Sequence, residues 1–101
     1  MKYTVIVSDT AKRQLASHIA FLANVSKPAA HNTKTNIMNA LRSLEKMPKR
    51  YPFLTQELLP KNKYHKMFVE SRYIVLYQIK DNEVFVDNIL DCHQEYEWLK
   101  D

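Results

Sequence analysis

The residue types best suited to chemistry gather at two places in the second half of the chain. One is Cys92-His93, directly after an apolar run, and the other is "PKNKYHKMF", which contains Lys63, His65 and Lys66. Histidine takes and gives protons near neutral pH, and lysine stabilises anionic oxygens. Cleavage of RNA at a 2′-hydroxyl needs a base, an acid and cations that hold the charge on phosphorus. The two segments therefore raise the hypothesis of a ribonuclease site.

Cys92 and His93 have two other chemical interpretations, and both are weaker. A tetrahedral zinc site needs a second spaced pair of ligands, and the other histidines (His18, His31 and His65) fall on different predicted elements. Neighbours on an extended segment point to opposite faces, so the thiol and the imidazole do not easily pair as nucleophile and base. We therefore expect no metal and no cofactor, with Cys92 packed inward as a small hydrophobic residue.

Composition sets the limits for such a site. With 101 residues and 46% hydrophobic content, the chain suits a single domain spanning 1–101. One cysteine excludes an internal disulfide, and no apolar run has the length of a membrane span or the form of a signal peptide. We therefore expect a cytoplasmic protein without membrane contact.

The charges are unevenly distributed along the chain. Residues 46–66 carry a formal charge of +5 and residues 67–101 carry −5, so the basic stretch offers a patch for an anionic partner. The alternative that its lysines are simply solvated stays open.

Periodicity predicts the elements that must position these residues. Tyr3 to Ser8 is rich in β-branched residues and predicts a strand, and apolar residues then recur at helical spacing. A second helix is expected after Ser26, a plausible cap, with Pro28 tolerated in its first turn and Met47-Pro48 at its end. The two helices should form a hairpin, followed by an ordered surface loop over residues 49–62.

The remaining chain predicts a sheet. "YHKMFVE", "RYIVLYQIK" and "EVFVDNIL" are rich in Val, Ile, Phe and Tyr, and Lys80-Asp81-Asn82-Glu83 has the residues of a hairpin turn. The order β-α-α-β-β-β predicts an α+β fold in which the helical hairpin packs on a small, twisted, mainly antiparallel sheet. If the last strand lies beside the middle one, His93 and the lysine-rich segment meet at one rim of that sheet.

The order and spacing of these pieces resemble the RelE/ParE superfamily, the toxin halves of bacterial type II toxin–antitoxin pairs. The resemblance covers nearly the whole chain and rests on "VIVSDTAKRQLASHIAFL", "IMNALRSLEKMPKRYPF", the three-stranded meander and the tail "DCHQEYEWL". It implies a RelE/ParE-like fold and a protein that arrests growth unless a cognate antitoxin wraps around it in a hetero-oligomer.

The resemblance also assigns roles to individual residues. Lys66 matches the basic residue that the family commonly has in the first meander strand. His93 and Tyr96 match a basic residue just past the last strand and a tyrosine three positions later. Many members carry an arginine after the central tyrosine, where this chain has Ile74. That replacement weakens transition-state stabilisation in a nuclease and leaves other cations to compensate.

Two functions follow from the resemblance, and of the two we expect the first, with the second as the alternative. In the first, the protein is an endoribonuclease that cuts mRNA in the ribosome, with two histidines moving protons. In the second, it is a ParE-like inhibitor of DNA gyrase without hydrolytic activity. The histidine and lysine set favours RNA, whereas the long, closely linked helical hairpin resembles the gyrase group. The predicted site comprises His93, His65 and Lys66 as catalytic residues and Lys63, Arg72 and Tyr96 as substrate-binding residues.

Overall fold

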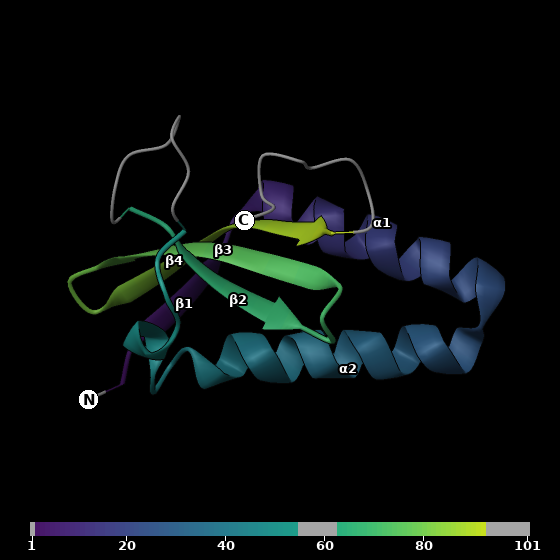
Figure 1. Ribbon diagram of the computed structural model, residues 1–101, viewed down its shortest axis with the longest axis horizontal. Helices are drawn as coiled ribbons and strands as arrows, with labels where there is room; N and C mark the ends of the chain where they lie inside the picture. Colours follow the sequence, from purple (N-terminus) through teal and green to yellow (C-terminus); the bar gives the residue numbers. More distant parts are fainter. Residues whose placement is uncertain (1, 55–62, 93–101) are drawn as a thin grey trace.

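The chain folds into two helices packed on a four-stranded sheet (Figure 1). The computed structural model describes residues 2–54 and 63–92. Within them, neither helix is long and apolar enough to cross a membrane. The order of elements confirms the predicted α+β fold. The elements are β1 (Thr4–Val7), α1 (Asp9–Val25), α2 (Lys27–Ser43), the short 3₁₀ helix η1 (Pro48–Arg50), β2 (His65–Val69), β3 (Tyr73–Lys80) and β4 (Glu83–Asp91).

Two serines define the helical hairpin. The Ser8 hydroxyl accepts a hydrogen bond from the Ala11 amide at 3.0 Å and caps α1. Ser26 ends α1 and at the same time caps α2, because its hydroxyl accepts from the Ala29 amide at 3.2 Å. The predicted cap and the predicted proline in the first turn of α2 are therefore confirmed.

The predicted end of the second helix is wrong by a few residues. The helix ends at Ser43 and not at Met47-Pro48. The amides of Leu44 and Glu45 donate three residues back, to Leu41 and Arg42, so the last turn tightens into 3₁₀ geometry. The Glu45 carbonyl then accepts from the Tyr3 amide at 2.6 Å, which ties the end of the hairpin to the strand before it.

The sheet has the strand order β1-β4-β3-β2. The predicted antiparallel meander is confirmed, with β2 paired to β3 and β3 paired to β4. β1 joins the far edge parallel to β4, with Thr4 opposite Glu83. Because β1 and β4 are nearly eighty residues apart, no local sequence signal predicted this pairing.

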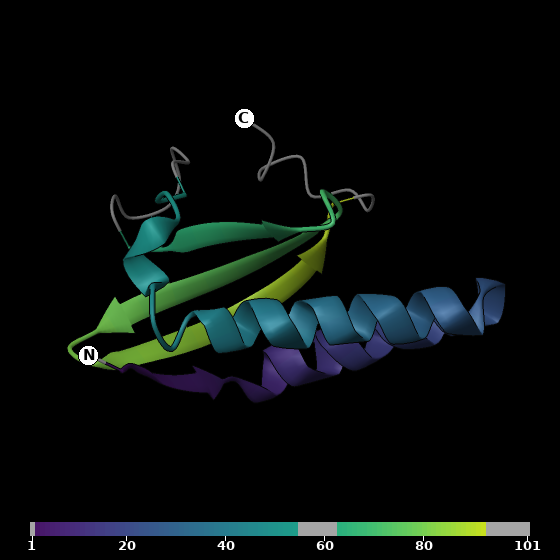
Figure 2. The same cartoon turned by 90° about the horizontal axis from the view of Figure 1, so that it is seen from below.

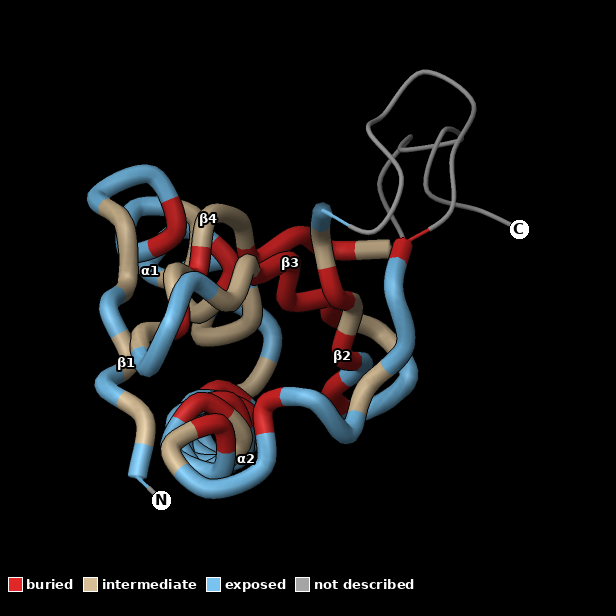
Figure 3. The backbone as a smooth tube through the Cα atoms, turned by 90° about the vertical axis from the view of Figure 1, so that its left-hand side faces the viewer, coloured by how far each residue is buried: buried red, intermediate tan, exposed pale blue. Residues whose placement is uncertain are grey.

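The helices cover one face of the sheet, as Figure 2 shows from below. Val75 and Tyr77 of β3 pack on that face in the main core, together with Ile37 and Leu41 of α2. Ile74, Leu76 and Leu90 form a second buried cluster with Leu54, which lies outside the main core. All residues from Ile74 to Tyr77 are buried. Figure 3 shows the buried part of β3 in red, and burial decreases toward its end at Lys80, which is exposed.

Candidate functional site

His65 at the start of β2 is held tightly by its neighbours. Its side chain is 7% exposed, and its ring lies 4.1 Å from the Phe53 ring and 5.2 Å from the Tyr77 ring. Its Nδ1 lies 2.7 Å from the Tyr51 carbonyl oxygen. A carbonyl only accepts, so Nδ1 carries the proton and donates it. His65 thus fastens the segment after η1 to the sheet, and only its Nε2 is left for other chemistry.

Lys66 lies on the other face of the sheet from His65. Side chains alternate along a strand, and Met67, two residues beyond His65, belongs to the main core under the helices. Lys66 therefore faces the side of the second cluster, where its strand partner is Leu76. The structure does not bring the predicted acid–base residue His65 and the predicted cation Lys66 together.

Lys63 is the predicted site residue that does lie beside His65. Its Nζ lies 5.3 Å from the centre of the Tyr64 ring. Both Lys63 and His65 border an open hollow of about 530 Å³ at the edge of the sheet. The lining residues of the hollow are Lys49, Phe53, Lys63, His65, Ile79 and Asp81.

Arg72 is engaged in a structural ion pair. Its Nε and Nη2 donate to the two carboxylate oxygens of Asp91 at 3.2 and 3.0 Å, and Asp91 is buried. Its guanidinium carbon lies 5.4 Å from the centre of the Tyr73 ring, and its carbonyl accepts from the Cys92 amide at 2.7 Å. The hydrogen bonds to Asp91 raise the pKa of Arg72. Arg72 therefore fastens the start of β3 to the end of β4.

The remaining predicted positions divide into two kinds. Ile74, where many family members have arginine, is fully buried in the second cluster. Cys92 is half-buried beside the same cluster, and burial raises the pKa of its thiol, which agrees with a packing role. His93 and Tyr96 lie outside the described residues, so their assignments stay predictions.

Sequence reasoning missed two polar contacts that order this end of the sheet. Asp91 pairs with Arg72. This contact could be predicted only from the strand register, which places Asp91 opposite Tyr73, the neighbour of Arg72. Glu70 accepts hydrogen bonds from Thr33 at 2.9 Å and Asn36 at 2.7 Å on α2, and no local pattern predicted this contact.

The arrangement of the described residues therefore suits a binding surface better than a compact catalytic centre. His65 is stacked and hydrogen-bonded, Arg72 is paired with Asp91, and Lys66 lies on the other face of β2 from His65. Within residues 2–54 and 63–92, no three His, Cys, Asp or Glu side chains come close enough to hold a metal ion.

Comparisons with known proteins found a family and a similar fold. Residues 5–96 match the family model of the ParE toxin of type II toxin–antitoxin system, parDE. A solved structure titled "Chromosomal ParDE TA system from P. aeruginosa" matches with a TM-score of 0.74 at 12% sequence identity, covering 89% of this chain and 96% of that chain. At that identity the likeness concerns the fold alone. No match was found among curated proteins.

Proposed function

Because this chain belongs to the ParE toxin family of type II toxin–antitoxin systems, we propose that it arrests growth by binding and inhibiting DNA gyrase, without hydrolytic chemistry of its own. The observation that carries this proposal is the separation of the candidate catalytic groups. His65 and Lys66 lie on opposite faces of β2, and Arg72 is bound by Asp91. A nuclease needs its base, acid and cations within reach of one phosphate.

Membership of this family also implies a cognate antitoxin as partner. We propose that the antitoxin contributes an acidic segment, because the described part of residues 46–66 is strongly basic. Such segments are commonly disordered alone and become ordered as they bury apolar surface on their target. The basic residues of that described part are Lys46, Lys49, Arg50, Lys63 and Lys66.

Two assays run side by side test the proposal. We expect the purified chain to inhibit supercoiling of relaxed plasmid by gyrase, and to leave mRNA intact on translating ribosomes. Addition of the antitoxin should restore supercoiling. Codon-dependent cuts in the mRNA, with supercoiling unaffected, would overturn the gyrase proposal and favour the ribonuclease.

A matched pair of variants sharpens this test. The double change Lys63→Gln, Lys66→Gln removes the two lysines of the predicted site, and Lys2→Gln, Lys80→Gln removes two exposed lysines elsewhere. In a nuclease the first pair should slow cleavage by about 10²- to 10⁴-fold, as loss of charge stabilisation does. In a gyrase inhibitor both pairs should change the inhibitory concentration by less than about tenfold, as single contacts outside hot spots do.

A further inference from the structure

One flank of α2 carries a row of basic side chains. Lys27, His31, Lys34 and Arg42 are all exposed, and they are spaced at helical intervals that place them within one narrow arc of the helix. With a rise of 1.5 Å per residue, the row is about 22 Å long. Met38, 44% exposed, lies in the same row. We call this row the α2 ridge.

The α2 ridge has no compensating acid on its own helix. The sequence of α2, "KPAAHNTKTNIMNALRS", contains no Asp or Glu. Among the described residues, none of the cations Lys27, Lys34 and Arg42 pairs with a carboxylate. The carboxylate of Glu70 binds α2 through Thr33 and Asn36, which lie on a different side of the helix from the ridge. The ridge therefore keeps a positive potential, which salt screens.

The position of Lys27 is unfavourable for the helix itself. It lies in the first turn of α2, where the amide groups already present partial positive charge and an acidic residue is stabilising. α1 follows that rule, since its first turn carries Asp9. Lys27 therefore gives the helix no electrostatic stabilisation, and its exposed charge adds to the positive potential of the ridge.

The ridge is open to a large partner. α2 lies along one border of the molecule in Figure 1. Seen nearly end-on in Figure 3, α2 is buried on the side toward the sheet and exposed on the opposite side.

We infer that the α2 ridge binds the phosphate backbone of duplex DNA. The two lysines and the arginine of the ridge follow one another at steps of about 10 to 12 Å along the helix, so each can neutralise a separate phosphate of the backbone. Protein partners are usually anchored by buried aromatic residues, and α2 contains no Phe, Tyr or Trp. Single-stranded nucleic acid also binds through aromatic stacking, so the same absence favours a duplex. The choice of DNA over RNA rests on the proposed function, because gyrase holds duplex DNA.

Binding to a short labelled duplex, followed by fluorescence anisotropy without gyrase, tests the inference. The ridge variant is Lys27→Gln, Lys34→Gln, and the matched control is Lys2→Gln, Lys80→Gln, in which the same number of exposed lysines is removed. We expect the slope of log K against log salt, measured from about 50 to about 200 mM, to fall by about 2 for the ridge variant. At the low-salt end its affinity should fall at least about tenfold, while the control keeps the wild-type slope.

Three results would overturn the inference. The first is an equal loss in the ridge variant and the control, which means that only total charge matters. The second is binding to duplex RNA or polyglutamate with none to DNA. The third is wild-type binding by a ridge variant whose melting temperature is unchanged. Gyrase inhibition is measured separately, so a chain that inhibits gyrase but binds no DNA contradicts this inference and leaves the proposed function standing.

Discussion

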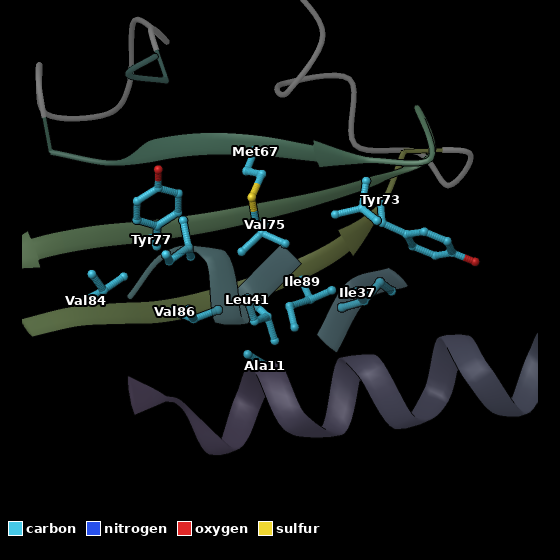
Figure 4. Close-up of a cluster of buried hydrophobic side chains, with 12 residues drawn as sticks. Ala11, Ile37, Leu41, Met67, Tyr73, Val75, Tyr77, Val84, Val86 and Ile89 are labelled. Atoms are coloured by element: carbon cyan, nitrogen blue, oxygen red, sulfur yellow. The ribbon is translucent and has the colours of Figure 1, made fainter. Parts of the chain in front are cut away.

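Two buried tyrosines on β3 have the same ring but different hydrogen bonding. The Tyr77 hydroxyl donates to the Pro48 carbonyl at 2.6 Å and so connects the sheet to η1. The Tyr73 hydroxyl is buried and finds no hydrogen-bond partner among the described residues. In Figure 4 it points away from the other labelled core side chains. A buried polar group without a partner costs stability, whereas a satisfied one contributes to it.

The two phenylalanine substitutions should therefore have opposite effects. Tyr73→Phe removes an unsatisfied hydroxyl and should raise the free energy of unfolding by about 1 kcal/mol. Tyr77→Phe leaves the Pro48 carbonyl unpaired and should lower it by about 1 to 3 kcal/mol. Urea denaturation measures both changes. A loss of stability in Tyr73→Phe would indicate that the hydroxyl has a partner, such as a buried water.

The surroundings of His65 were predictable from the sequence only in part. Alternation along an extended segment was used to separate Cys92 from His93, and the same rule separates His65 from Lys66. The sequence could therefore predict that these two side chains do not share a face. It could not predict that the Tyr51 carbonyl binds His65, because that contact depends on how residues 51–54 run beside β2.

At the scale of elements, the turn between β2 and β3 stores backbone strain. Glu70 and Ser71 have φ angles of 58° and 55°, a region that disfavours every residue with a Cβ. The chain contains no glycine to relieve this cost. The contacts from Thr33 and Asn36 to Glu70 hold the turn against α2, which offsets part of the strain.

Substitution of Glu70 or Ser71 by glycine should separate the effect of backbone strain from that of the hydrogen bonds to α2. Ser71→Gly relieves the strain at an exposed residue and should raise the free energy of unfolding by about 0.5 to 1 kcal/mol. Glu70→Gly gives the same backbone relief but removes both hydrogen bonds to α2, so it should be neutral or destabilising. Thermal and urea unfolding of both variants provide the measurement. Equal stabilisation by the two substitutions would show that the Glu70 contacts contribute nothing.

Elements with local signals were predictable, and those that depend on distant contacts were not. The helices and the meander could be predicted because their signals depend only on neighbouring residues. These signals are the serine caps, the proline in the first turn of α2 and the Asp81-Asn82 turn. The parallel pairing of β1 with β4 and the early end of α2 depend on partners far along the chain. The same division explains the site, because the Asp91 partner of Arg72 follows only from the register of β3 and β4.

For the whole molecule, the buried tyrosines make stability depend on pH in the alkaline range. Burial raises the pKa of both Tyr73 and Tyr77 above the ordinary tyrosine value. Between the unfolded and the folded pKa, the folded state keeps protons that the unfolded state has lost. Stability therefore falls as pH rises through this window, which begins at about pH 10.

The Tyr73→Phe variant tests how much of this pH dependence comes from Tyr73 alone. Each buried tyrosine contributes a slope of up to about 1.4 kcal/mol per pH unit above the unfolded pKa. The free energy of unfolding is measured with urea from about pH 9 to about pH 11. We expect it to fall less steeply with pH in Tyr73→Phe than in the wild type, and the two slopes should differ by up to about 1.4 kcal/mol per pH unit. Cys92 and Tyr77 are present in both chains, so their titration cancels in the difference. Parallel pH profiles in the two chains would mean that Tyr73 ionises as readily in the folded protein as in the unfolded one, and that its hydroxyl reaches solvent.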